Sequence, residues 1–138
     1  MAIEKCFLDT NILIDHILVR RPFEKEANEI LDLSEQNVIM SSLSMLTLAT
    51  ASFYAEKMYE PLLVKELFIQ LSSFCEILPA TKKNLDWAVH SKFTDLEDGI
   101  QNHIAESNGC TTIITRNKKD FKKSKLAVLT PEEFLATL

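Results

Sequence analysis

Short apolar runs alternate along this chain with longer segments in which apolar residues recur every three or four positions. The first pattern is typical of buried strands and the second of helices that bury one face. Strands are predicted at 3–8, 38–40, 76–78, 111–115 and 126–129. Helices are predicted through 12–17, from 22 to about 33, from a cap at 42 or 44 to about 58, from 61 to 71, after 81, between 95 and 109, and from 131.

Short polar residues and glycine mark the boundaries of these elements. Thr10 or Asn11 is expected to cap the first helix, and Ser42 or Ser44 the third. Gly109 is expected to end the sixth. Strands that alternate with helices form a parallel sheet covered on both faces. The predicted fold class is therefore α/β, a three-layer α/β/α sandwich with a central parallel sheet of four to five strands.

Composition agrees with one soluble globular domain over residues 1–138. Apolar residues make up 46% and charged residues 25% of the chain, and two glycines leave no room for a flexible linker. We find neither a secretory signal nor an apolar stretch of about 20 residues, so we expect a cytoplasmic protein without a membrane segment. The three cysteines Cys6, Cys75 and Cys110 have apolar neighbours and are expected to be reduced core thiols.

Charge is distributed unevenly along the chain. The net charge of −5 argues against a protein that coats nucleic acid non-specifically. The segment 116–125 contains six basic residues and one acid, so it carries +5 and the remainder −10. This segment is either a basic patch for a polyanion or a loop kept soluble by lysines, and charge alone favours the loop.

Polar residues gather at the predicted carboxyl ends of the strands, where parallel sheets bind ligands. Asp9 follows the first strand. It is either an acid that faces the crevice or the N-cap of the helix that follows. Asp95, Asp98 and Asn102 have the spacing of one helix face, although an acidic first turn also suits the helix dipole. Thr115 begins a third group after the fourth strand, followed by Arg116, Asn117, Lys118 and Asp120.

Carboxylates that lie together repel one another, and a hard cation such as Mg²⁺ or Mn²⁺ relieves the repulsion. The chemistry of such a site is metal-assisted hydrolysis of a phosphodiester. Histidines 16, 90 and 103 have no metal-binding spacing, and a Gly-rich phosphate loop is missing. A dehalogenase-type phosphatase would need a second acid where Asn11 stands, so we set that class aside.

Four segments in this order resemble the PIN domain family, the PilT N-terminus-like ribonucleases found as toxins of bacterial toxin–antitoxin pairs. They are 7–13 (FLDTNIL), 41–44 (SSLS), 95–101 (DLEDGIQ) and 113–121 (IITRNKKDF). The resemblance covers essentially the whole chain. It implies a PIN-like fold, RNA as substrate, Mg²⁺ or Mn²⁺ as cofactor, and an antitoxin protein and a second copy of the chain as partners.

The resemblance also implies a set of site residues. The candidate catalytic residues are Asp9, Asp95, Asp98 and Asp120, with Asp9, Asp98 and Asp120 as metal ligands. Thr10, Asn11, Thr115 and Asn117 would orient them, and Arg116 and Lys118 would contact substrate phosphate. Two positions where the family has acids carry Thr47 and Asn117 instead.

Two functions therefore remain open. The first is a divalent-metal-dependent endoribonuclease, which the four aspartates favour and which the resemblance implies is a toxin. The second is a catalytically weak or inactive PIN-like module that binds RNA or a protein, as Thr47 and Asn117 favour. Apolar residues between 43 and 74 cover more than one helical stripe, which indicates either a deeply buried helix pair or a homodimer face.

Overall fold

Five parallel strands form the centre of the computed structural model, which describes residues 3–138. They are β1 (Lys5–Leu8), β2 (Met40–Ser44), β3 (Cys75–Leu78), β4 (Thr112–Ile114) and β5 (Ala127–Leu129). The order across the sheet is β3-β2-β1-β4-β5, and each neighbouring pair is parallel. The direction of winding reverses between β1 and β4, and ligands bind in the crevice at such a switch point.

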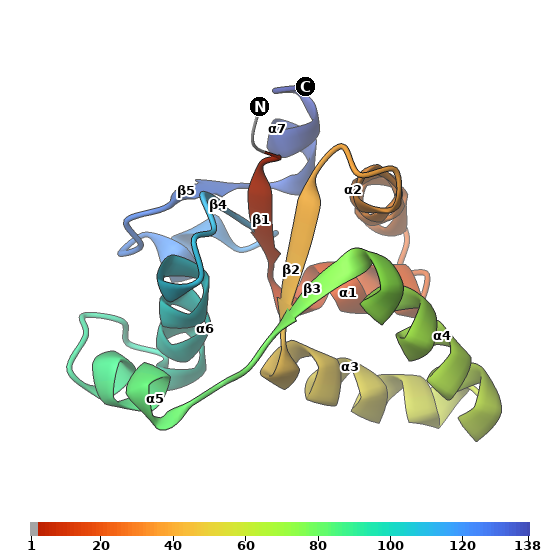
Figure 1. Cartoon of the computed structure of the whole chain (residues 1–138), viewed down its shortest axis with the longest axis horizontal. Helices are drawn as coiled ribbons and strands as arrows, with labels where there is room; N and C mark the ends of the chain where they lie inside the picture. Colours follow the sequence, from red (N-terminus) through yellow and green to blue (C-terminus); the bar gives the residue numbers. More distant parts are fainter. Residues whose placement is uncertain (1–2) are drawn as a thin grey trace.

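Helices cover both faces of this sheet (Figure 1). They are α1 (Thr10–Ile17), α2 (Glu24–Glu35), α3 (Met45–Met58), α4 (Pro61–Phe74), α5 (Lys82–Val89), α6 (Leu96–Ser107) and α7 (Pro131–Leu135), with a 3₁₀ helix η1 (Lys118–Phe121). Alternate residues of β1 point to opposite faces. Cys6 and Leu8 join the core beneath α1 to α4, whereas Phe7 packs with Ile104 of α6. The predicted three-layer α/β/α fold is confirmed.

Two predicted boundaries are wrong, and both involve short polar side chains. Asp9, rather than Thr10 or Asn11, caps α1, because its carboxylate accepts the Thr10 N–H. The second strand was expected at 38–40 but runs through serines to Ser44, and Val38 is exposed. The predicted cap of α3 at Ser44 is confirmed, since its hydroxyl accepts the N–H of Thr47.

Buried thiols complete the core. All three cysteines, Cys6, Cys75 and Cys110, are free and buried, as the sequence predicted. Burial raises the pKa of both Cys6 and Cys75 to about 12, so these thiols stay protonated at neutral pH. From residue 3 to the C-terminus, none of the helices combines the length and the apolarity needed to cross a bilayer.

The helix pair α3–α4 leaves large apolar side chains exposed. The exposed fraction is 55% for Phe53, 60% for Met58, 74% for Leu62 and 70% for Ile69. In a single chain this helix pair is therefore not deeply buried, and that interpretation of the sequence is wrong. The alternative that the sequence left open, a face that meets a second copy, remains a prediction.

Candidate functional site

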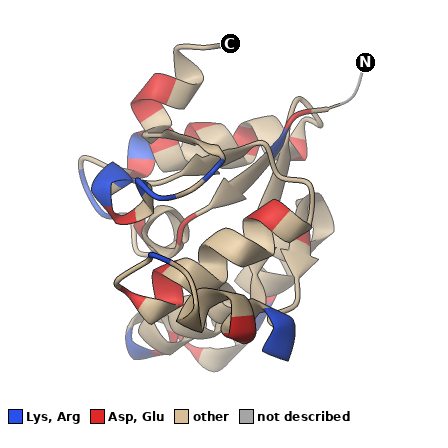
Figure 2. Cartoon of the chain, turned by 90° about the vertical axis from the view of Figure 1, so that its left-hand side faces the viewer, with Lys and Arg blue, Asp and Glu red and all other residues tan. Residues whose placement is uncertain are grey.

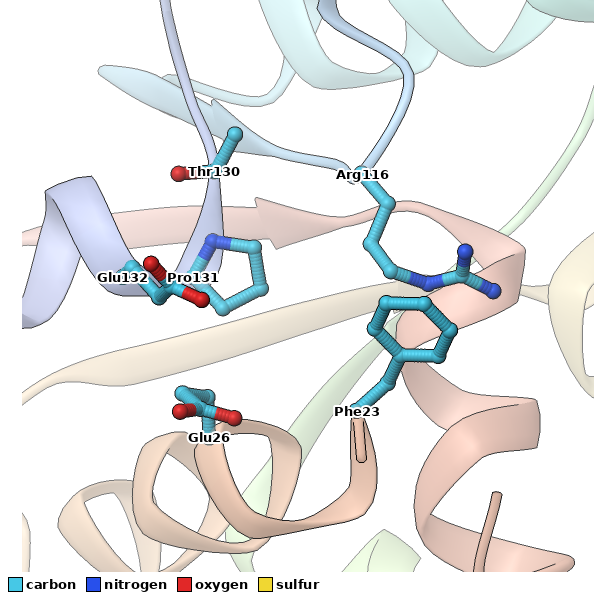
Figure 3. A pocket seen from close by; sticks show the side chains of 6 residues that line it. All are labelled: Phe23, Glu26, Arg116, Thr130, Pro131 and Glu132. Atoms are coloured by element: carbon cyan, nitrogen blue, oxygen red, sulfur yellow. The ribbon is translucent and has the colours of Figure 1, made fainter. Parts of the chain in front are cut away.

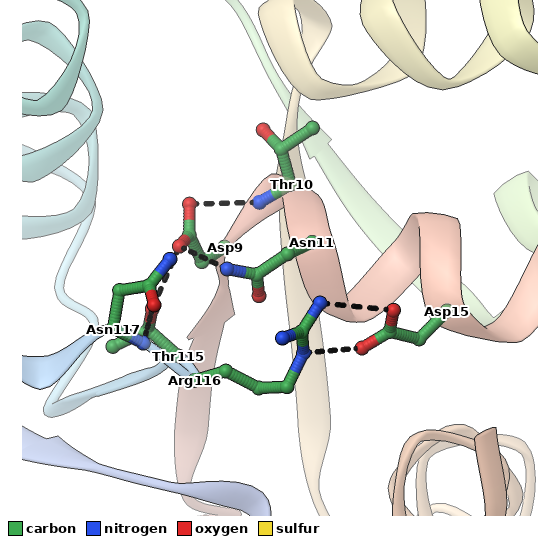
Figure 4. Close-up of polar contacts among 7 residues, drawn as sticks. All are labelled: Asp9, Thr10, Asn11, Asp15, Thr115, Arg116 and Asn117. Carbon is green, nitrogen blue, oxygen red and sulfur yellow. Dashed lines mark hydrogen bonds and ion pairs between the residues drawn. The ribbon is translucent and has the colours of Figure 1, made fainter. Parts of the chain in front are cut away.

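Asp9 lies at the switch point between β1 and β4, and three donors fix its carboxylate (Figure 4). Oδ1 accepts the Thr10 N–H at 2.8 Å, and Oδ2 accepts the Thr115 hydroxyl at 2.7 Å and the Asn11 amide at 3.2 Å. Burial raises the pKa of Asp9, against the lowering effect of the Thr115 and Thr10 hydrogen bonds. The charge of Asp120 adds to the rise. The carboxylate is thus held in one orientation beside a like charge.

Asp98 lies half-buried in the first turn of α6. Asp95 caps this helix, accepting the Asp98 N–H at 2.9 Å. Burial is the main reason that the pKa of Asp98 rises to about 7, and the charges of Asp95, Asp9, Asp120 and Glu97 contribute in that order. The sheet topology therefore brings the predicted aspartates of three separate segments within electrostatic reach of one another.

Asp95, Asp98 and Asp120 line a hollow of about 330 Å³, called the acidic cleft below. Four lysines surround these aspartates, namely Lys92, Lys119, Lys122 and Lys123. Figure 2 shows this side of the molecule, with basic residues concentrated on the segment that follows β4. Acids and lysines that line the same cleft suit a polyanion that meets a cation there. Asn102, one turn after Asp98 on α6, is fully buried and donates to Glu106.

Thr47 stands in a buried, uncharged hydrogen-bond network. Its hydroxyl lies 2.9 Å from that of Thr10 and accepts the Gln101 amide at 3.0 Å. Ser44 closes the network, donating to Gln101 Oε1 at 2.6 Å. Thr47, Ser44 and Gln101 are each at most 1% exposed. The network therefore occupies, without charge, the position where the family resemblance places a glutamate.

Arg116 and Lys118, the predicted phosphate contacts, are both engaged by acids. Arg116 donates to both oxygens of the buried Asp15, at 2.7 and 3.2 Å, and its guanidinium lies 3.9 Å from the centre of the Phe23 ring. Figure 3 shows this stacking beside a hollow of about 370 Å³. Lys118 pairs with Glu133 at 3.0 Å on the surface. A phosphate would have to compete with these acids.

The oxygen atoms at this site suit a hard cation as ligands, although the acidic side chains do not form a closed metal site. Between residues 3 and 138, no three Asp, Glu, His or Cys side chains are close enough to form a ready-made metal site. Asn11 Oδ1 is buried next to Asp9 and has no hydrogen-bond partner among the described residues. Carboxylates that repel one another and an unpaired amide oxygen fit Mg²⁺, which keeps several waters and takes one or two carboxylates.

Sequence reasoning missed several residues of this site. The role of Gln101 was not predicted, because its pairing with Ser44 and Thr47 joins residues more than 50 positions apart in the chain. Asn117 is exposed, and its backbone N–H donates to the Thr115 hydroxyl. A helical segment rich in Ser and Thr that lacks the expected acid is the one signal that could have suggested an uncharged network.

Comparison with known proteins identifies the family. A profile of the PIN domain matches residues 5–119, so this chain belongs to the PIN domain family. Ribonuclease VapC1 of Aquifex aeolicus (strain VF5) is 30% identical over 142 residues, which cover 97% of this chain and 95% of that protein.

Two solved structures share the fold. One belongs to a toxin–antitoxin complex from Klebsiella pneumoniae, with a TM-score of 0.70, 26% identity, and coverage of 91% of this chain and 97% of that one. The other is VapBC2 from Rickettsia felis bound to a DNA fragment from its promoter, with a TM-score of 0.64, 20% identity, and coverage of 91% and 96%. The predicted resemblance to the PIN family is confirmed.

Proposed function

We propose that this chain is the ribonuclease of a toxin–antitoxin pair and hydrolyses RNA phosphodiester bonds with the help of Mg²⁺ or Mn²⁺. The observation that supports this most is that Asp95, Asp98 and Asp120 line one cleft, where burial and the neighbouring charges raise the pKa of Asp98 to about 7. Perturbed carboxylates in a cleft are typical of functional sites. The similarity to a protein named ribonuclease VapC1 supports RNA as the substrate.

Three of the four aspartates are metal ligands in this proposal, and Asp95 caps the helical turn that carries Asp98. Asp9 and Asp98 would hold the cation, and Asp120, which is exposed on η1 and lines the acidic cleft, would supply a third carboxylate. Thr10, Asn11 and Thr115 keep Asp9 oriented, as their hydrogen bonds support. When bound, Mg²⁺ or Mn²⁺ supplies an activated water and neutralises charge on the phosphate.

The lysines of the acidic cleft hold the RNA backbone. Lys119, Lys122 and Lys123 are exposed and line the cleft, so they are better phosphate contacts than Arg116 and Lys118, which acids already engage. Phosphate contacts of this kind position the strand and carry no sequence information. Their charge also offsets the repulsion between an acidic chain and a polyanion.

A second candidate is a PIN module that binds RNA or a protein and cleaves weakly or not at all. The network of Ser44, Thr47 and Gln101 favours it, because these buried side chains satisfy one another and leave no carboxylate there. Asn117 removes a further charge. Both changes weaken cation binding. If the chain is a ribonuclease, we expect it to need a higher metal concentration than a PIN domain with acids at both of these positions.

Two protein partners belong to the proposal. An antitoxin is supported by the likeness to a chain from a toxin–antitoxin complex. A homodimer is supported by the exposed apolar residues of α3 and α4, notably Leu62 and Ile69. Leu62 and Ile69 are seven positions apart in α4 and therefore share one helix face, and exposed apolar surface of this kind is typical of interaction sites.

The test is cleavage of mixed RNA by the purified chain with Mg²⁺ or Mn²⁺, with and without a chelator. We expect cleavage that requires metal and is lost in Asp98→Asn. Glu97→Gln is the matched control, because it removes an exposed acid from the same helical turn without lining the cleft. Folded protein that leaves all RNA intact at high metal would favour the binding module.

A further inference from the structure

A second hollow, of about 360 Å³, adjoins the acidic cleft and is called the Trp87 pocket below. It shares Lys92, Phe93 and Lys123 with the cleft, and Trp87 and His90 form the rest of its aromatic wall. The side chains of both lysines are exposed, so the pocket joins aromatic surface to positive charge. It therefore lies where the strand leaving the cleft would pass.

The indole of Trp87 is held in place before any ligand arrives. The ring of His103 stacks against it with centroids 5.0 Å apart and planes 15° apart, and Phe93 packs at 6.0 Å. His103 is fixed in turn, since its Nδ1 accepts the amide of the buried Asn84 at 2.9 Å. Asn84 Oδ1 accepts the Thr81 N–H at 2.8 Å in a capping box. A rigid platform loses little entropy on binding.

We propose that the Trp87 pocket binds a nucleobase of single-stranded RNA, next to the phosphate in the acidic cleft. This inference rests on the proposed RNA substrate. Aromatic side chains beside a positively charged groove bind single strands because every base has a face that can stack. The pocket tolerates different bases, since its aromatic wall offers stacking surface rather than a fixed pattern of donors. Its lysines contact the flanking phosphates.

Trp87 is the single tryptophan of the chain and reports directly on this pocket. The experiment titrates the full chain with a short single-stranded RNA in the presence of a chelator, so that binding is measured without cleavage. We expect saturable quenching of the indole fluorescence. The control ligand is the same oligomer without bases, and we expect it to bind more weakly and to leave the fluorescence unchanged. Equal quenching by the oligomer without bases would overturn the proposal.

Variants test the same site by the anisotropy of a labelled RNA. Trp87→Leu should weaken binding by about tenfold, the effect of losing one stacked base, whereas Trp87→Phe should keep most of the affinity. Lys123→Gln should also weaken binding and reduce its salt dependence, and Lys25→Gln on α2 is the matched control. Because Trp87→Leu removes packing against Phe93 and His103, its circular dichroism is compared with that of the wild type.

The outcomes separate this inference from the proposed function. RNA cleavage that is normal in a folded Trp87→Leu variant, with unchanged affinity, would overturn the pocket and leave the ribonuclease standing. Base-dependent quenching in a chain that cleaves no RNA would support the pocket and contradict catalysis. An affinity equal in Lys123→Gln and the wild type would count against both the pocket and the phosphate contacts of the cleft, because the two share this lysine.

Discussion

Replacing Arg116 by alanine tests whether this residue serves the fold or the substrate. In the structure its guanidinium donates to both oxygens of Asp15, whose side chain is 1% exposed, and stacks on Phe23. Removing one partner of a buried ion pair leaves an uncompensated charge and costs about 3 kcal/mol. An entropy of unfolding of about 2.1 cal/mol/K per residue gives about 0.3 kcal/mol/K for a chain of 138 residues. Arg116→Ala should therefore lower Tm by about 10 °C.

Thermal unfolding followed by circular dichroism measures this shift. Lys118→Ala is the control, because its pair with Glu133 is about half exposed, and surface ion pairs of this kind contribute little to stability, so Tm should hardly change. Adding Asp15→Asn to Arg116→Ala should restore part of the loss, because it removes the unpaired charge. If Arg116→Ala unfolds within about 2 °C of Lys118→Ala, the ion pair does not stabilise the fold as we reason.

Three further predictions concern the acidic cleft and the apolar face. The pKa of Asp98 is about 7 in the folded chain, against an ordinary value of 3.8. Between about pH 4 and 7 the folded chain therefore keeps a proton on Asp98 that the unfolded chain releases, and the free energy of unfolding falls as the pH rises. Asp98→Asn should accordingly raise the free energy of unfolding of the metal-free chain at pH 8 by on the order of 1 kcal/mol after solvent screening, seen as a higher Tm in thermal melts, and the gain should vanish at about pH 4. An unchanged Tm at pH 8 would contradict the repulsion. Asn117→Asp adds an exposed carboxylate and should strengthen Mn²⁺ binding by about tenfold in calorimetry, whereas an unaltered affinity would remove this position from the site. Ile69→Glu, on an apolar side chain that is 70% exposed, should leave the chain folded but monomeric in light scattering, and a wild type that is itself monomeric would reject the dimer face.

Local patterns predicted the layers and the sheet well. The apolar spacing of α3 and α4 and the proline at the start of α4 place these helices where the structure has them. The second strand was misplaced because its serines were interpreted as caps of the helix that follows. Within the sheet they find partners far along the chain, since Ser42 donates to Glu76 and Ser44 to Gln101.

Part of the site could also be predicted from the sequence. Parallel strands end at one edge, so Asp9, Asp98 and Thr115 could be brought together from the order of elements alone. Arg116 could not be assigned in this way, because Asp15 lies 101 positions earlier and is buried by packing that no short motif encodes. The role of Trp87 depends on its stacking with His103 and was likewise invisible.

The measurement that tests the central claim most directly uses an RNA of defined sequence with a 2′-deoxy nucleotide on the 5′ side of the bond that is cut. Hydrolysis by a metal-activated water does not involve the 2′-hydroxyl. The account predicts that Mn²⁺-dependent cleavage persists on this substrate in the wild type and is lost in Asp9→Asn and in Asp98→Asn. Cleavage that the deoxy nucleotide blocks, that survives a chelator, or that both variants retain would contradict it.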